Sequence, residues 1–285
     1  MIRDDFACFI LCHGRPNSVK TFKSLRKRNY TGKIYIVCDD LDSTVNEYKS
    51  IYGDDVVLVF NKLEILQKFD TMDSSDNRAC AVYARNACFE FAQQLGIKYF
   101  CELDDDYSDF WLRPILNGRM ASIQVPDLDT VFSLHIDFLN LSKDIYSVAF
   151  AQNGDMIGGA ACQLVKNGYK RKCMNSWICD VDKFFTFNGR MNDDVNTYSL
   201  EGHRGKVFIT FPWISVDQPC TQVVKGGMTD MYSGEGTYVK SFYTVMCCPS
   251  FIKVAMMGEK DFRIHHNVDW NAATPKIISS KYRKE

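Results

Sequence analysis

The stretch GIKYFCELDDD at residues 96–106 decides the fold of this chain. Its glycine ends a helix-like segment, and the apolar run from Ile97 to Leu103 has the length and continuity of a strand that is covered on both faces. Three adjacent carboxylates follow, at Asp104, Asp105 and Asp106. Taken alone, such a triplet is equally consistent with a solvated acidic turn, so the segments around it decide its interpretation.

Strand-like and helix-like segments alternate through the residues before the triplet. Apolar runs predict strands at residues 6–12, 33–38, 56–60 and 97–103, and capped or periodic segments predict helices at residues 17–28, 42–52 and 79–95. This alternation is typical of an α/β fold with a parallel sheet, in which ligands bind beyond the carboxyl ends of the strands. Polar residues stand at three of those ends, namely His13, Arg15, Asp39, Asp40 and the triplet.

Beyond residue 107 the pattern is less regular. It predicts helices at residues 128–141, 193–202 and 238–248, strands at 145–151, 173–181 and 207–211, and a mobile glycine-rich loop at 226–236. Neither a repeat nor a clear linker is visible. We therefore expect a single domain over residues 1–285, in which residues 1–110 form one half and residues 111–285 form an elaborated second half.

The composition narrows the class of protein. The 285 residues include 34 Lys and Arg against 35 Asp and Glu, which excludes a polycation that coats nucleic acid but allows a local basic face. The 12 cysteines contain no CxxC pair, and their apolar surroundings favour buried thiols in a reducing cytoplasm. No apolar run approaches the roughly 20 residues of a membrane span, and the acidic N-terminus is unlike a signal peptide.

The triplet itself has the chemistry of a metal site. Alternate residues of an extended chain share a face, so we expect Asp104 and Asp106 to converge while Asp105 points away. Adjacent carboxylates repel one another, and a cation relieves that repulsion. Two hard oxygen ligands suit Mg²⁺ or Mn²⁺, which commonly complete their shell with phosphate oxygens and water.

Three motifs in order resemble those of nucleotide-sugar glycosyltransferases with the GT-A fold. They are IYIVCDD at 34–40 with DST at 42–44, YARNA at 83–87, and the stretch at 96–106. Together with FILCHGRP at 9–16 and YTGKI at 30–34, they look closest to the TET/JBP-associated branch, found in phages and beside DNA-base-oxidising enzymes. The resemblance implies a Rossmann-like, mostly parallel sheet flanked by helices. It also implies transfer of a sugar from a UDP-sugar to the hydroxymethyl group of 5-hydroxymethylcytosine or 5-hydroxymethyluracil in DNA.

The resemblance implies roles on the donor side. Asp39 or Asp40 would accept a hydrogen bond from the nucleobase, and Arg85 would reach the base or the phosphates. Asp106 would hold the metal. The predicted donor-binding set is His13, Arg15, Asp39, Asp40, Arg85, Asp104, Asp105 and Gly159. Local ion pairs are the alternative for the basic members of this set, and a tight turn is the alternative for the glycine.

On the acceptor side, the resemblance implies a carboxylate base downstream of the triplet in an inverting enzyme. Asp193 and Asp194 open a predicted helix there, and we slightly favour Asp194; helix N-capping is the alternative for either. The segment RIHHN at 263–267 resembles one in which a histidine completes the metal shell. Alternation puts His265 and His266 on opposite faces, so we expect only one to bind metal and favour His266.

A DNA acceptor requires a basic face. The segment KNGYKRK at 166–172 combines cations with an aromatic ring in a glycine-containing turn, and a solvated loop is the alternative. Its candidate DNA-binding residues are Lys166, Tyr169, Lys170, Arg171 and Lys172.

Three other functions remain open at this point. They are a glycosyltransferase with a protein or glycan acceptor, a nucleotidyltransferase that also needs paired carboxylates and a metal, and a nucleotide-sugar-binding module without catalysis. The sequence decides neither the sugar nor the oligomeric state. The expected location is the cytoplasm, that of an infected host cell if a phage encodes the chain.

Overall fold

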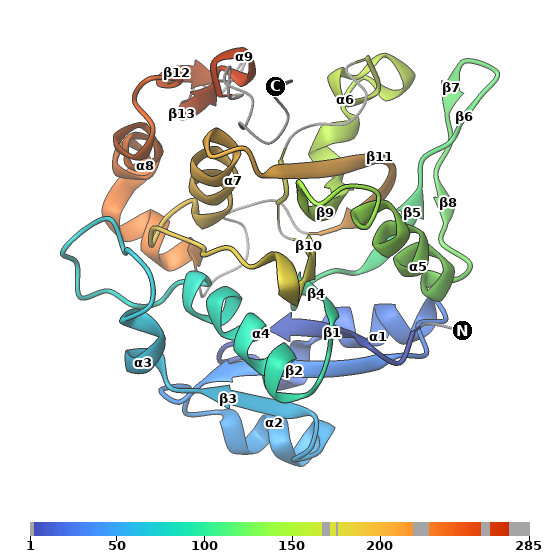
Figure 1. The fold of residues 1–285 in the computed structure, drawn as a ribbon, viewed down its shortest axis with the longest axis vertical. Coiled ribbons are helices and arrows are strands. Elements are labelled where there is room, and N and C mark those ends of the chain that lie inside the picture. Colours follow the sequence, from blue (N-terminus) through green and yellow to red (C-terminus); the bar gives the residue numbers. More distant parts are fainter. Residues whose placement is uncertain (1–2, 167–171, 175, 219–227, 258–262, 274–285) are drawn as a thin grey trace, which may run out of the picture.

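A central sheet runs through the molecule (Figure 1). The computed structural model describes residues 3–166, 172–174, 176–218, 228–257 and 263–273. Within them the sheet has nine strands in the order β3-β2-β1-β4-β10-β9-β11-β5-β8. Its first four strands are parallel, which confirms the predicted α/β class: β1 (Phe6–Leu11), β2 (Lys33–Asp39), β3 (Val57–Phe60) and β4 (Tyr99–Asp104).

The sheet becomes mixed from β10 onward. β10 (Ser176–Asp180) is antiparallel to both β4 and β9 (Ile145–Gln152), and β11 (Val207–Asp217) is parallel to β9. The edge strands β5 (Asp109–Leu112) and β8 (Ile123–Gln124) add antiparallel pairs. β11 is longer than predicted because its second part, after a register shift, pairs with β5.

Both faces of the parallel half are buried, because the side chains of β1 alternate between two cores. Phe6, Cys8 and Ile10 pack into one cluster together with residues of α1 (Lys20–Lys27), α2 (Val45–Tyr52) and α5 (Leu128–Leu139). Ala7, Phe9 and Leu11 pack into the other, together with residues of α3 (Lys62–Leu66), α4 (Val82–Gln94) and α7 (Asp193–His203). The continuous apolar run at 6–12 predicted this two-sided burial.

The remaining elements surround the second half of the sheet. None of the helices in the described ranges combines the length and the apolar character that crossing a bilayer requires. The elements that surround the second half of the sheet are α6 (Gln163–Lys166), α8 (Met228–Cys247), α9 (Trp270–Ala273), the antiparallel pair β6 (Ile115–Leu116) and β7 (Arg119–Met120), and the antiparallel pair β12 (Ile252–Met257) and β13 (Arg263–Val268).

The prediction of a loop at residues 226–236 is wrong from Met228 onward, where α8 begins. Glycines at four positions in 226–236 suggested a loop, yet in the described part of this stretch only Gly236 leaves the helical conformation, with φ 88° and ψ 157°. The helix therefore consists of two segments joined at a glycine that supplies the left-handed φ. Residues 226 and 227 lie outside the described ranges.

Candidate active site

The carboxyl ends of β1, β2 and β4 meet at one edge of the sheet. β1 and β4 pair in parallel with Leu11 opposite Asp104, so the loop after β1 lies beside the acidic triplet. The Arg15 guanidinium in that loop donates to Asp105 Oδ1 over 2.8 Å. The structure therefore brings the predicted donor-binding residues of the first and fourth strands together.

The three carboxylates of the triplet have different surroundings. Asp105 is buried and paired with Arg15, whereas Asp104 and Asp106 are half-buried. Asp106 has no ion-pair partner among the described residues, while Asp104 Oδ1 lies 3.4 Å from Arg85 Nη2. Burial and the neighbouring carboxylates raise the pKa of Asp104 to about 7, and burial raises the pKa of Asp106 above its ordinary value although the charge of Arg15 opposes this. This excess of negative charge favours a cation.

Arg85 is a buried centre that joins three segments of the chain. From α4 its Nε donates to Asp193 Oδ2 on α7 over 2.8 Å, and its Nη1 donates to Glu102 Oε2 on β4 over 3.3 Å. Its third nitrogen reaches Asp104. The side chain is only 4% exposed and its partners lie 17 to 108 residues away, so the alternative of a local ion pair at the surface does not apply. Arg85 fixes the triplet strand against the helix that carries the candidate base.

One guanidinium does not neutralise three carboxylates, and Glu102 is the one that keeps its proton. Glu102 is fully buried, and burial raises its pKa to about 8 although Arg85 opposes the shift. Its Oε1 has no hydrogen-bond partner. Near neutral pH the centre thus consists of Arg85⁺, a largely neutral Glu102, an Asp104 that is partly protonated because its pKa is about 7, and Asp193.

A second polar group fills the turns after β1 and β2. His13 Nδ1 lies 3.0 Å from Asp39 Oδ2, and Lys62 Nζ lies 3.2 Å from the same oxygen. The hydrogen bond to Asp39 raises the pKa of His13. Because Asp39 is buried and already paired, the exposed Asp40 is the better of the two candidates for contact with a nucleobase.

The first turn of α7 carries both candidate bases, and neither is its N-cap. Asn192 holds that position with φ 52° and ψ 39°, and its side-chain amide donates to Lys240 O and Thr244 Oγ1 of α8. Asp193 is paired with Arg85. Asp194 is half-buried, accepts a hydrogen bond from the Val195 amide, and has no ion-pair partner among the described residues. Burial raises its pKa, which suits a proton acceptor.

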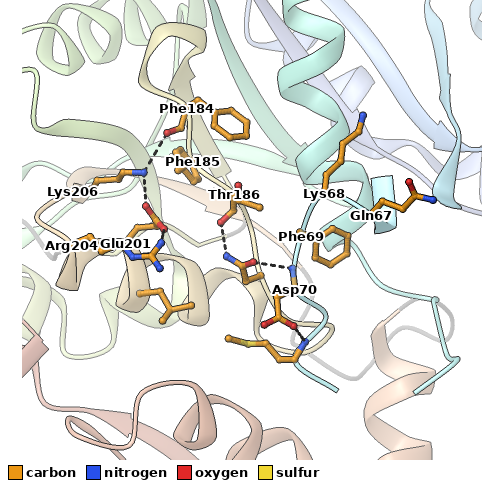
Figure 2. Close-up of a pocket in the computed structure, with 13 residues that line it drawn as sticks. Gln67, Lys68, Phe69, Asp70, Phe184, Phe185, Thr186, Glu201, Arg204 and Lys206 are labelled. Carbon is orange, nitrogen blue, oxygen red and sulfur yellow. Dashed lines mark hydrogen bonds and ion pairs between the residues drawn. The ribbon is translucent and has the colours of Figure 1, made fainter. Parts of the chain in front are cut away.

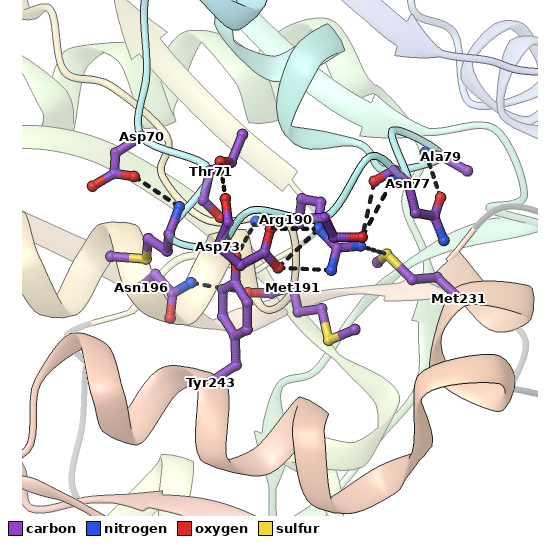
Figure 3. A network of polar contacts seen from close by, with 12 residues as sticks. Asp70, Thr71, Asp73, Asn77, Ala79, Arg190, Met191, Asn196, Met231 and Tyr243 are labelled. Carbon is purple, nitrogen blue, oxygen red and sulfur yellow. Dashed lines mark hydrogen bonds and ion pairs between the residues drawn. The ribbon is translucent and has the colours of Figure 1, made fainter.

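A network around Arg190 holds the turn that leads into α7 (Figure 3). Arg190 is 1% exposed and binds Asp73 through Nε and Nη2, with distances of 2.7 to 3.0 Å. Its backbone amide donates to the hydroxyl of Tyr243 in α8, and that hydroxyl donates to Thr71 O. The acidic loop before α4, the turn before Asp193 and α8 are therefore one connected unit.

The two histidines of the C-terminal segment lie in β13, which was not predicted as a strand. Their rings stack with centroids 4.2 Å apart and planes 30° apart, so the expectation that alternation separates them is wrong. Burial lowers the pKa of His266 to about 4, and the charge of Lys240 contributes. His266 Nδ1 has no hydrogen-bond partner. The charge of Lys240 also opposes the rise that burial causes in the pKa of Asp194.

The other predicted site residues belong to the segment from Gly159 to Lys172. Gly159 begins the 3₁₀ turn Gly159–Ala161 with φ 56°. Lys166 is exposed at the end of α6. Lys172 is not the surface cation that was predicted, because it is 13% exposed and pairs with Asp155 over 3.1 Å. Tyr169, Lys170 and Arg171 lie outside the described residues.

A pocket of about 760 Å³ lies elsewhere, at the carboxyl end of α7 (Figure 2). It is lined by the segment around Phe69, by Phe184 and Phe185, and by Arg204 and Lys206, and it contains no predicted site residue. Both Arg204 and Lys206 pair with Glu201. The pocket is therefore separate from the carboxylate edge.

Sequence reasoning missed three residues of this region, namely Glu102, Lys62 and Arg190. The signal for Glu102 was present, because a glutamate inside an apolar strand must find a buried partner. Lys62 and Arg190 gave no such signal, since each acts through a residue distant in the sequence, Asp39 and Asp73.

Within the described ranges, no three His, Cys, Asp or Glu side chains gather into a ready-made metal centre. A cation at this edge therefore needs ligands from its substrate as well. The partner-free Asp106 carboxylate is a hard oxygen donor, and the unpartnered His266 nitrogen belongs to a neutral imidazole. The donor chemistry fits Mg²⁺ or Mn²⁺ shared with a phosphate group.

Comparison with known proteins gives a family and distant structural neighbours. The family model described as TET-associated glycosyltransferase matches residues 6–227. No curated protein matches the chain.

Two solved structures illustrate the neighbours. Glucosyl-3-phosphoglycerate synthase from Mycobacterium tuberculosis, in complex with Mn²⁺, uridine diphosphate and phosphoglyceric acid, has 6% identity and a TM-score of 0.46 over 92% of this chain and 86% of that one. A mannosyltransferase from Pyrobaculum calidifontis, in complex with GDP-Man and Mn²⁺, has 11% identity and a TM-score of 0.47 over 78% of this chain and 59% of that one.

Glu102→Gln is expected to change the pH dependence of stability. The folded-state pKa of about 8 lies above the ordinary 4.5, so between these values the folded chain holds a proton that the unfolded chain releases. The contribution of Glu102 to stability therefore falls as pH rises through this window. When thermal unfolding is followed from about pH 5 to about pH 8, the stability of Glu102→Gln relative to the wild type should increase with pH. If the stability of the two proteins changed with pH in the same way, the raised pKa of Glu102 would be contradicted.

Arg190→Met is expected to destabilise the fold by about 3–5 kcal/mol, because it removes a buried charge partner of Asp73. The matched control is Lys68→Met, which breaks the exposed pair with Glu90 and should cost at most about 1 kcal/mol. Urea unfolding followed by fluorescence measures both. Equal effects of the two substitutions would show that the Arg190 network does not hold the turn before α7.

Proposed function

This chain belongs to the TET-associated glycosyltransferase family and is therefore a glycosyltransferase, and we propose that it glycosylates DNA. In this proposal it moves a sugar from a UDP-sugar to the hydroxymethyl group of 5-hydroxymethylcytosine or 5-hydroxymethyluracil, with inversion and with a divalent metal. The observation that carries the proposal is the pair of unlike carboxylates on α7. Asp193 is held by Arg85, while its neighbour Asp194 has no ion-pair partner among the described residues.

Asp194 is the proposed catalytic base. A primary alcohol is a weak nucleophile until a positioned group accepts its proton. The new bond forms between the hydroxymethyl oxygen and the anomeric carbon of the sugar, the bond from that carbon to the diphosphate breaks, and the proton goes to Asp194. The link from Asp193 through Arg85 to Asp104 supports this role, because it ties the first turn of α7 to the triplet.

Asp106 is the proposed metal ligand, and Asp104 faces the ribose and the sugar. Two stacked histidines remain candidates for a second ligand, with His266 favoured because its Nδ1 has no partner. When bound there, Mn²⁺ or Mg²⁺ neutralises the charge of the departing diphosphate. Arg15 pairs with Asp105 and Arg85 with Asp104, so both arginines place positive charge beside the triplet.

In this proposal each half of the chain binds one of the two substrates. Residues 1–110 bind the nucleotide sugar through the turns that hold His13, Arg15 and Asp40. Residues 111–285 bind the acceptor, and Gly159 lies near the transferred sugar. The family is TET-associated, and TET enzymes oxidise methylated bases, which supports a hydroxymethylated base as acceptor.

A protein or glycan acceptor is the second candidate. Mass spectrometry of DNA that contains 5-hydroxymethylcytosine or 5-hydroxymethyluracil, after incubation with a panel of UDP-sugars and Mn²⁺, decides between the two. The expected result is a mass increase of one sugar on the modified base and release of UDP. Donor hydrolysis to UDP without any modified DNA would favour the other acceptors, and release of pyrophosphate would contradict sugar transfer.

Asp194→Asn is expected to lower kcat by about 10²–10⁴-fold, because the amide does not accept the proton. UDP affinity, measured by calorimetry, should stay unchanged. The control is Asp182→Asn, which alters a carboxylate with 76% side-chain exposure and should keep full activity. Wild-type turnover by Asp194→Asn would remove this residue from the mechanism.

Asp106→Ala is expected to abolish metal-dependent turnover while the far-UV circular dichroism and the melting temperature stay close to wild type. The control is Asp54→Ala, whose carboxylate is 87% exposed. The wild type should lose activity in EDTA and regain it with Mn²⁺. Full activity of the variant, or of the wild type in EDTA, would contradict a metal-assisted departure of the diphosphate.

A further inference from the structure

A rigid two-stranded ribbon extends from the edge of the sheet. Between β5 and β8 the chain forms the β6–β7 hairpin, which reaches away from the body of the molecule at the upper right of Figure 1. Its two turn residues, Asn117 and Gly118, have φ values of 50° and 73°. A two-residue turn with both φ values positive matches the twist of the flanking strands, so it presents the tip in a fixed geometry.

The charged side chains of this ribbon are all positive. Residues 110–126 contain two arginines and neither Asp nor Glu, in a chain with 35 acidic residues. Arg113 is used at the base of the ribbon, where it donates to Ser215 over 2.8 Å, to Asn153 over 3.0 Å and to Ser122. Arg119 is exposed near the tip. The ribbon is thus anchored by one arginine and presents the other to solvent.

The two faces of the hairpin differ. Cross-strand partners share a face, and the pairs are Ile115 with Met120 and Leu116 with Arg119. Met120 packs against the small core around Cys162 and Leu164, so its face turns toward the body. Leu116 is 54% exposed beside Arg119 on the other face. This outer face therefore presents an apolar side chain and a cation side by side.

The hairpin also lies beside residues already placed on the acceptor half. β7 contacts the 3₁₀ turn that begins at Gly159, and that turn leads into α6 and the exposed Lys166. At the base of the ribbon, Trp213 is 49% exposed and its carbonyl accepts a hydrogen bond from the Arg113 amide over 2.8 Å. One side of the molecule therefore carries a cationic tip, an exposed indole and the start of the basic segment.

We propose, on the basis of the DNA acceptor inferred above, that the β6–β7 hairpin is the element that grips the DNA next to the target base. Arg119 binds a backbone phosphate, and Leu116 enters the groove. A two-stranded ribbon fits a DNA groove, and a surface with cations and without carboxylates complements a polyanion. An apolar side chain between base steps lowers the cost of unstacking, which the enzyme needs because a stacked base does not reach Asp194.

The test uses the full chain and a short duplex with one 5-hydroxymethylcytosine, flanked by 2-aminopurine as a reporter of unstacking. Arg119→Gln should weaken duplex binding and lower the slope of log Kd against log salt concentration by about 1. Leu116→Ser should raise the KM for duplex by about tenfold and reduce the 2-aminopurine signal. The controls are Leu141→Ser and Arg204→Gln, which alter exposed residues outside the ribbon. UDP affinity, measured by calorimetry, checks that each variant is folded.

The outcomes separate this inference from the function on which it rests. If the wild type glycosylates the duplex and both hairpin variants bind and react like it, the hairpin proposal is overturned and the DNA acceptor stands. If the wild type neither binds nor modifies DNA but hydrolyses UDP-sugars, both proposals are overturned. If Leu116→Ser converts a dimer into a monomer and leaves DNA binding unchanged, the exposed face belongs to a second copy of the chain, which also overturns the proposal.

Discussion

A single buried guanidinium joins the carboxylate edge of the sheet to the first turn of α7. Arg85 reaches from α4 to Glu102 and Asp104 on β4 and to Asp193 on α7. These three carboxylates come from segments that are about ninety residues apart in the chain, so the ion pairs fix the distance between the two halves of the site. Burial disfavours an excess of negative charge in such a centre, and the proton that Glu102 keeps removes one of its three negative charges.

In each of two pairs of adjacent aspartates, one carboxylate is paired with an arginine and the other is not; we call them the inner and the outer carboxylate. Asp105 pairs with Arg15 and Asp193 pairs with Arg85, while Asp106 and Asp194 have no ion-pair partner among the described residues. The inner carboxylates position the backbone, and the outer ones face the space where substrates bind in the proposed mechanism. Adjacent acidic residues thus have different roles because only one of each pair reaches a buried cation.

The sequence predicted the parallel half of the fold well, because strands such as β1 are buried on both faces and have continuous apolar runs. It also predicted that the polar residues after β1, β2 and β4 lie at one edge, since the carboxyl ends of parallel strands meet there. The short strands β5 to β8 and the β12–β13 hairpin were missed, because a strand of two to six residues at an edge has little periodicity of its own. Arg85 was found by its motif, but its burial was not predictable, since it depends on Asp193 far along the chain.

We infer that the Asp106 carboxylate binds a divalent ion together with the diphosphate of a nucleotide sugar. The most direct measurement is anomalous diffraction from crystals soaked with UDP and Mn²⁺. The account predicts one manganese peak within coordination distance of the Asp106 carboxylate, bridged to the phosphates of UDP. A manganese ion and UDP bound together away from Asp106, for example in the pocket at the carboxyl end of α7, would contradict it.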